Sequence, residues 1–163
     1  MSQHALFQLG MDLDAPSTAQ TEDQTKRTTD LEAYEDERKD HFITKNGIKC
    51  AGTHLIIDLL GADRLDDIAH VEETLIKCVE TAGATLLHIH LHHFEPNGGV
   101  SGVAVLAESH ISIHSWPEND YAALDVFMCG DAKPELCVEV LREAFSPSHV
   151  VVGEHLRGQG VTG

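Results

Sequence analysis

The stretch ESHISIHSWPE, residues 108–118, gathers side chains whose types and spacing could do chemistry. Residues alternate between the two faces of a β-strand, so we expect Ser109 on one face with two isoleucines, and His110 and His114 on the other. Trp116-Pro117 then ends the strand, because proline cannot donate a hydrogen bond to a ladder. Core packing alone would favour aliphatic residues at several of these positions. The stretch therefore predicts a site that combines a hydroxyl nucleophile, imidazoles, an indole and carboxylates.

A second set of possible ligands lies in ATLLHIHLHHF, residues 84–94, which alternates like a strand. His88, His90 and His92 share one face of that strand, and imidazoles are common zinc ligands. On a straight strand, however, these three positions span about 13 Å, too far for one ion. We therefore expect no metal site, and a zinc-binding module stays open only as a non-enzyme alternative.

Two common kinds of active site fit the sequence poorly. A hydrolase with a Ser-His-acid triad is expected to carry its serine in a G-x-S-x-G turn, whereas Ser109 lies in a strand pattern. Pyridoxal phosphate needs a lysine for its internal Schiff base. Apart from Lys45 and Lys49 near its start, the folded part offers only Lys77 and Lys133, at helix-like or loop positions. These observations disfavour the hydrolase and reject pyridoxal phosphate as the cofactor.

The elements that must position these side chains follow from hydrophobic periodicity and turn signals. Asp63 is the expected cap of the first helix and Pro134 the expected first-turn residue of the second. The strand that begins at Val100 is expected to run with little or no break into the Ser109 stretch. The pattern predicts strands over 54–60, 84–94, 100–107, 109–116, 121–129 and 150–152, and helices over about 65–82 and 134–145.

This order of elements predicts an α+β fold: a two-layer sandwich of a mainly antiparallel sheet with helices on one face. The chain is too short to cover the other face of the sheet itself. We therefore expect dimerisation through the sheet, which would complete a four-layer αββα arrangement.

Composition separates the chain into two parts. Residues 1–47 are polar and charge-dense, so we expect a mobile acidic N-terminal extension, with an ordered domain over 48–163 that begins near Gly47. The net charge of −16 argues against nucleic-acid partners and anionic membranes. No apolar run approaches the roughly 20 residues that span a bilayer. Four cysteines without a C-x-x-C pair, and an N-terminus without a signal-peptide pattern, favour a cytoplasmic protein.

The segment VSGVAVLAESHISIHSWPENDYAALDVFMCGD, residues 100–131, resembles the prokaryotic S-adenosylmethionine decarboxylase proenzyme family. The preceding HHFEPNGG extends the resemblance, which covers about residues 50–155. The elements ESH-x-x-IH-x-WPE and YAA-x-D-x-F-x-CG both occur at the family's mutual spacing. The resemblance implies a cytoplasmic enzyme of polyamine biosynthesis, a carboxy-lyase that supplies the aminopropyl donor for spermidine, built as a homo-oligomer of αβ units.

The resemblance also implies that the chain processes itself between Glu108 and Ser109. The Ser109 hydroxyl would attack the Glu108 carbonyl, and elimination and hydrolysis would leave a β chain 1–108 and an α chain 109–163. The α chain would begin with a covalent pyruvoyl group, formed from Ser109, that makes a Schiff base with the substrate amine. Decarboxylation of an α-amino acid requires such an electron sink, which no ordinary side chain provides.

Further roles carry over from the family by position. Ser101 and His114 match the processing serine and the processing base, and Cys129 matches the proton donor. An imidazole suits the elimination step because its pKa lies near neutrality. The substrate-binding positions, expected to hold the adenine and the ribose hydroxyls of S-adenosylmethionine, are Phe94, Trp116 and Glu118.

Two departures and two alternatives accompany this interpretation. The N-terminal extension is absent from the usual short form of the family, and the loop FEPNGGVS is one residue longer than expected, which bears on the placement of Phe94. One alternative is a pyruvoyl decarboxylase of the same fold that acts on ornithine or arginine. Another is an unprocessed, non-catalytic binding or regulatory paralogue.

Overall fold

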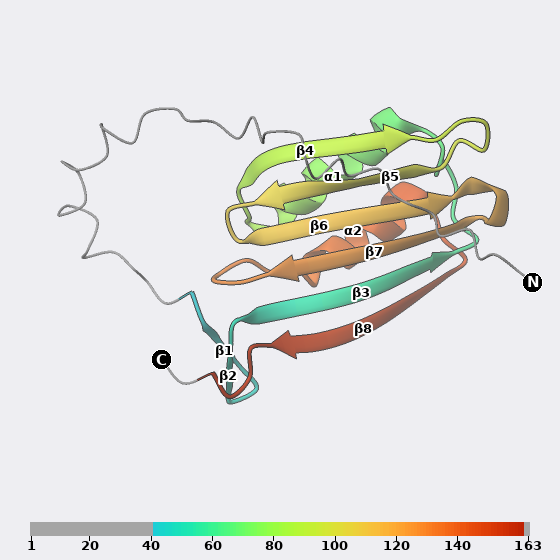
Figure 1. The fold of residues 1–163 in the computed structure, drawn as a ribbon. Coiled ribbons are helices and arrows are strands. Elements are labelled where there is room, and N and C mark those ends of the chain that lie inside the picture. The colour runs from blue at the N-terminus through green and yellow to red at the C-terminus, as the bar shows by residue number, and fades with distance from the viewer. Residues whose placement is uncertain (1–40, 162–163) are drawn as a thin grey trace, which may run out of the picture. The chain divides into compact units, whose positions relative to one another are not determined.

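The computed structural model describes residues 41–161, and these fold around one six-stranded sheet (Figure 1). Most of the expected extension over residues 1–47 lies outside the described residues. The described chain is nevertheless ordered before Gly47, because a small β-hairpin already begins at Ile43. The elements are Ile43–Lys45 (β1), Ile48–Cys50 (β2), Gly52–Leu60 (β3), Ile68–Ala82 (α1), Leu86–His93 (β4), Val100–Leu106 (β5), Ser109–Trp116 (β6), the 3₁₀ turn Pro117–Asn119 (η1), Tyr121–Met128 (β7), Leu136–Phe145 (α2) and His149–Arg157 (β8).

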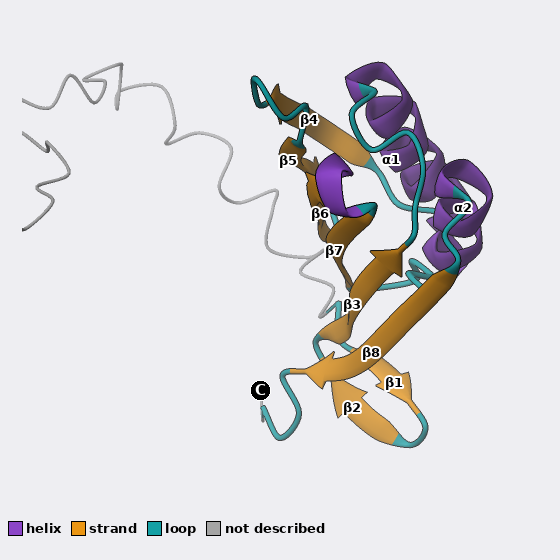
Figure 2. Cartoon of the chain, turned by 90° about the vertical axis from the view of Figure 1, so that its right-hand side faces the viewer, coloured by secondary structure: helices purple, strands orange, loops and turns teal. Residues whose placement is uncertain are grey.

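The strands of the main sheet follow the order β4-β5-β6-β7-β3-β8, and every neighbouring pair is antiparallel. Both helices, α1 and α2, cover the same face (Figure 2). The α+β class and the single helical layer expected from the sequence are therefore confirmed.

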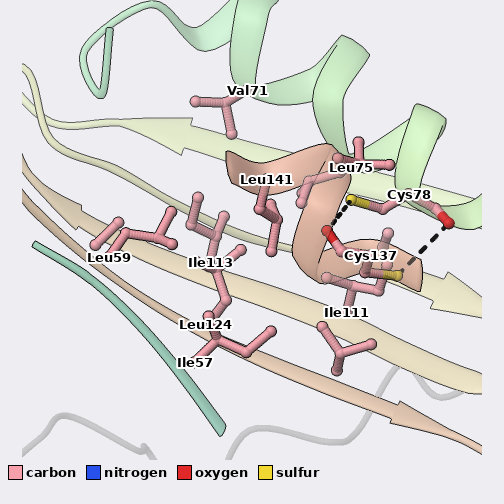
Figure 3. Packing of buried hydrophobic residues seen from close by; sticks show 14 of the residues in the cluster. Ile57, Leu59, Val71, Leu75, Cys78, Ile111, Ile113, Leu124, Cys137 and Leu141 are labelled. Carbon is pink, nitrogen blue, oxygen red and sulfur yellow. Dashed lines mark hydrogen bonds between the residues drawn. The ribbon is translucent and has the colours of Figure 1, made fainter. Parts of the chain in front are cut away.

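The core fills the space between the helices and the covered sheet face (Figure 3). Alternation along the strands produces it, because Leu55, Ile57 and Leu59 point inward from β3 and Ile111 and Ile113 point inward from β6. Each such side chain contributes roughly 1.5–3 kcal/mol when it leaves water. The inward stripe on β6 therefore fixes which residues of the same strand face away from the helices.

Two buried thiols join the helices inside this core. Cys78 of α1 donates to the carbonyl of Cys137 over 3.9 Å, and Cys137 of α2 donates to the carbonyl of Cys78 over 3.6 Å. The hydrogen bond with Cys137, together with burial, raises the pKa of Cys78, so this group stays a neutral thiol. All four cysteines of the chain are free.

The expectation of an almost unbroken strand over residues 100–116 is wrong. Val105 pairs with His110 in antiparallel register, so the chain reverses direction at Ala107 and Glu108. No glycine or proline marks this turn. It is held instead by Thr85, whose carbonyl accepts the Ala107 N–H at 3.0 Å.

The starts of both helices also differ from the expected positions. Asp67 rather than Asp63 caps α1, because its carboxylate accepts the His70 N–H at 3.0 Å. Pro134 lies two residues before the first residue of α2, in the turn that leads into it. Neither difference between the expected and the observed helix start concerns a residue of the candidate site.

Candidate active site

The sheet face without helices carries polar and aromatic side chains. Near its centre, the Asp125 carboxylate accepts the Ser112 hydroxyl at 3.3 Å and lies 3.1 Å from His54 Nε2. The Tyr121 hydroxyl donates to Asp58 at 2.6 Å, and this bond raises the pKa of Tyr121. Two cavities lie near opposite ends of β6.

The first cavity, of about 380 Å³, contains the predicted cleavage site. Its lining includes Glu108, Ser109 and Cys129, which the structure brings together at the β5–β6 turn and the end of β7. His41 and Phe42, which the sequence analysis did not single out, line the same cavity. Their only sequence signal is that they directly precede β1.

The carbonyl oxygen of Glu108 sits between two donors from one residue. It accepts the backbone N–H of Cys129 at 3.2 Å and the Cys129 thiol at 2.8 Å. Donors placed in this way stabilise the negative charge that appears on a carbonyl oxygen when a nucleophile attacks its carbon. The carbonyl that Ser109 would attack is therefore the one that the site activates.

The backbone at the predicted cleavage site is held in an unusual conformation. Ser109 has φ 154°, in a region that residues with a side chain rarely adopt. Such conformations cost on the order of 1–3 kcal/mol and cluster at functional sites. The Ser109 hydroxyl lies 3.2 Å from Nδ1 of His110, so the structure gives His110 a contact with the expected nucleophile that the sequence did not predict.

The Glu108 side chain anchors the other half of the bond that is predicted to be cleaved. Its carboxylate accepts the Thr85 N–H at 2.8 Å and the Thr85 hydroxyl at 3.2 Å. These two bonds turn the carboxylate toward the start of β4 and hold the residue whose carbonyl is predicted to be attacked. Thr85 was missed because no short motif surrounds it.

The thiol of Cys129 is set up to carry a proton. Burial is the main reason that its pKa is raised, the Glu108 carboxylate adds to the rise, and a backbone hydrogen bond opposes it. A thiol whose pKa is raised stays protonated to higher pH than an ordinary cysteine. This state fits the proton-donor role expected for Cys129.

We expect this raised pKa to set the alkaline limit of turnover. For the wild-type protein, kcat should hold through neutral pH and fall only above the ordinary thiol pKa of about 8.5. Cys129→Ala should lose that alkaline limb and about 10²-fold in kcat, as removal of a general acid does. The measurement is kcat against pH, normalised to the fraction of cleaved chain seen by mass spectrometry, because the variant also loses one donor to Glu108. An unchanged alkaline limb in the variant would contradict the role.

The second cavity, of about 240 Å³, lies at the other end of β6. Ser101 and His114 face each other across β5 and β6, with the serine oxygen 2.8 Å from Nδ1 of His114. Phe94 and Trp116 line the cavity, and both rings are partly exposed, at 45% and 39%. The structure therefore places the two predicted adenine-binding rings on one cavity.

Local contacts hold this end in shape. Trp116 stacks on Tyr121, with ring centroids 5.3 Å apart, and Glu118 accepts a long 3.5 Å hydrogen bond from Asn97. Gly99 lets the loop approach β6, because a Cβ there would lie 2.8 Å from the Ser115 carbonyl oxygen. This close approach leaves Phe94 on the cavity.

The two cavities do not meet within one chain. Ser109 pairs with Met128, whereas His114 pairs with Ser101, and the two residues lie five positions apart on β6. Five strand residues span about 17 Å. The sequence analysis treated all these residues as one set, but one copy of the chain presents them as two groups: Glu108, Ser109 and Cys129, and then Ser101, His114, Phe94, Trp116 and Glu118.

The described residues include no group of three or more histidine, cysteine or acidic side chains that could hold a metal ion. His88, His90 and His92 do share the uncovered face of β4, opposite alternate residues of β5. The described part of the chain also contains no helix long and apolar enough to cross a membrane.

The fold and these two groups define an α+β protein in which two hydrogen-bond donors hold the peptide carbonyl directly before a serine. Comparison with known proteins identifies the family. The family model for S-adenosylmethionine decarboxylase matches residues 53–158, and the chain belongs to that family.

Relatives and a solved structure agree with this assignment. An S-adenosylmethionine decarboxylase proenzyme from Thermomicrobium roseum is 45% identical over 112 residues, which cover 68% of this chain and 97% of the relative. The proenzyme from Methanococcus vannielii is 47% identical over 114 residues, covering 68% and 93%. The crystal structure of adenosylmethionine decarboxylase from Aquifex aeolicus superposes with a TM-score of 0.61 at 35% identity, covering 67% of this chain and 92% of that one.

Proposed function

We propose that this chain is a self-processing, pyruvoyl-dependent decarboxylase of S-adenosylmethionine that supplies the aminopropyl donor for spermidine biosynthesis. The observation that carries the proposal is the pair of Cys129 donors on the Glu108 carbonyl, directly before Ser109. Family membership supports the reaction and the substrate.

Cleavage begins with the Ser109 hydroxyl. Its oxygen attacks the carbonyl carbon of Glu108 while the carbonyl oxygen is held by Cys129, and the peptide C–N bond breaks to leave an ester and a free amine. A base then removes the α-proton of Ser109, and the ester C–O bond breaks to release the Glu108 carboxylate. The remaining dehydroalanine tautomerises and is hydrolysed, so water enters and ammonia leaves. A pyruvoyl group then stands where Ser109 was.

His114 is the proposed base for that proton, with Ser101 bound to its Nδ1. Because His114 lies about 17 Å along β6 from Ser109 in the same chain, we infer that the histidine comes from a second copy. A two-fold axis between two facing sheets, crossing their strands, would place the Ser109 end of one copy against the His114 end of the other. The uncovered sheet face leaves Ile56 and Val105 partly exposed, and these apolar side chains support this arrangement, which is the four-layer dimer expected from the sequence.

The residues present fit the formation of a pyruvoyl group. Cys129 holds the Glu108 carbonyl, and the following Ser109 has a backbone conformation that few residues with side chains adopt. Once formed, the group supplies the electron sink for loss of carbon dioxide. The Cys129 thiol then returns a proton to the α-carbon of the substrate. Phe94 and Trp116 of the second copy hold the adenine between their faces, and Glu118 binds the ribose hydroxyls.

The proposed partners and location follow from the same observations. The substrate is the small molecule S-adenosylmethionine, and the macromolecular partner is a second copy of the chain. A nucleoside-bearing substrate is favoured over ornithine or arginine, because a free amino acid needs neither stacking rings nor a ribose anchor. Four free cysteines support the proposed cytoplasmic location.

The test is an intact mass spectrum of the purified protein under denaturing conditions. We expect two chains, residues 1–108 and 109–163, with the smaller about 17 Da lighter than a chain that begins with serine, because ammonia has been lost. Decarboxylation assays with S-adenosylmethionine, ornithine and arginine should show activity only with the first. A single uncut chain of 17.8 kDa after long incubation would contradict the proposal.

A further inference from the structure

Some residues that line the Ser109 cavity lie outside the range that the family model matches. His41 and Phe42 line this cavity beside Ser109 and Cys129, yet the family model begins only at residue 53. They directly precede the β1–β2 hairpin, and the proposed mechanism assigns no role to them or to the hairpin.

Several contacts hold this segment against the cavity. The Gly130 N–H, next to Cys129, donates to the His41 carbonyl at 3.1 Å. The His41 ring lies close to the same glycine, since its Nδ1 is 3.7 Å from the position of a Cβ at Gly130. Lys45 of β1 forms a 3.0 Å ion pair with Glu154 of β8, which ties the hairpin to the main sheet.

Cationic side chains gather near the cavity, although the whole chain carries −16. Among the described residues that line it, His41 is the only side chain that can become a cation. Two further cations lie over lining rings: the Lys49 ammonium is 5.1 Å from the Phe42 centroid, and the Arg157 guanidinium is 5.8 Å from the Phe127 centroid. The one acidic lining residue, Glu108, has its carboxylate bound by Thr85.

We propose that His41 and Phe42 form the subsite for the α-carboxylate of the substrate, with His41 as the contacting cation and Lys49 and Arg157 as flanking charges. This inference rests on the proposed function, because it assigns the group that is lost as carbon dioxide. The carboxylate lies next to the α-carbon, which the Ser109-derived group and Cys129 must both reach. A cationic rim on this cavity therefore meets the one anionic group of S-adenosylmethionine.

The chemistry of decarboxylation predicts an unusual kinetic signature for such a contact. The negative charge leaves the carboxylate as carbon dioxide forms, so His41 binds the substrate more strongly than the transition state. Loss of the contact should raise KM without lowering kcat. A histidine that transferred a proton would instead lower kcat when removed.

The experiment compares His41→Gln with the wild-type protein, using S-adenosylmethionine and its decarboxylated product as a matched pair of ligands. We expect His41→Gln to cleave fully by mass spectrometry and to raise KM for the substrate about 5–10-fold, as exchange of a charged hydrogen bond for a neutral one does. Its kcat should be equal to or higher than that of the wild type. Calorimetric binding of the product, which lacks the carboxylate, should not change. His41→Arg should restore KM, and His149→Gln, on the exposed start of β8, should behave as the wild type.

Each outcome decides the inference separately from the proposed function. Equal weakening of substrate and product would show that His41 only shapes the cavity, and an unchanged KM would show that another cation, such as Arg157, binds the carboxylate. A fall in kcat with unchanged KM would indicate proton transfer instead. Failure of the proposed function would appear earlier, as a wild-type chain that neither cleaves nor decarboxylates S-adenosylmethionine.

Discussion

Ser109→Ala is expected to remain a single chain of residues 1–163 and to show no decarboxylase activity. Alanine has no hydroxyl to attack the Glu108 carbonyl, so the acyl shift cannot start, and no pyruvoyl group forms. The expected loss is complete rather than partial, because the proposed mechanism makes one residue both the nucleophile of cleavage and the source of the cofactor. Intact mass spectrometry and release of carbon dioxide from labelled S-adenosylmethionine measure the two effects independently.

Two comparison variants make this result specific. Ser148 lies between α2 and β8, away from both cavities, and its hydroxyl donates to the Leu60 carbonyl. Ser148→Ala removes this hydroxyl and should cleave like the wild type. Ser109→Cys keeps a nucleophile at the cleavage site and should cleave, but more slowly. Cleavage at this position in Ser109→Ala would refute the assignment of the nucleophile.

Much of the fold could be predicted from the sequence because hydrophobic alternation is strong in this chain. Inward residues such as Ile111 and Ile113 recur at period two, and the apolar stripe of α1 recurs at period 3.6. The reversal between β5 and β6 could not be predicted, because it contains no glycine or proline. It depends on Thr85, which is distant in sequence and holds both Ala107 and Glu108 through hydrogen bonds.

The chemistry of the site was more predictable than its geometry. The spacing of ESH-x-x-IH-x-WPE singled out Ser109, His114 and Trp116, and the five strand positions from Ser109 to His114 already imply about 17 Å. The sequence did not provide the pairing across strands, which sets Ser101 beside His114. His41 escaped prediction for a related reason: its place on the cavity depends on a backbone bond to Gly130, not on a motif.

The separation of the two cavities leads to the second large effect, which concerns mixed dimers. Ser109→Ala and His114→Ala should each be inactive when expressed alone, because every site lacks either the nucleophile or the base. When both are expressed together, a mixed dimer contains one site with intact Ser109 from one copy and intact His114 from the other. Random pairing makes half of the dimers mixed, with one complete site in two, so about a quarter of wild-type activity should return.

A second pair of variants distinguishes shared sites from a general rescue of folding. Ser109 and Cys129 lie on the same cavity of the same copy, so Ser109→Ala mixed with Cys129→Ala produces no site that contains both residues. This mixture should show no more activity than Cys129→Ala alone, whereas Ser109→Ala with His114→Ala recovers. Recovery in neither mixture would mean that His114 acts within its own chain. A movement would then have to close the roughly 17 Å that separates it from Ser109 along β6. Recovery in the first mixture alone follows only if the strand register divides each site between two copies, with the serine, its activated carbonyl and the thiol on one side and the base and nucleoside pocket on the other.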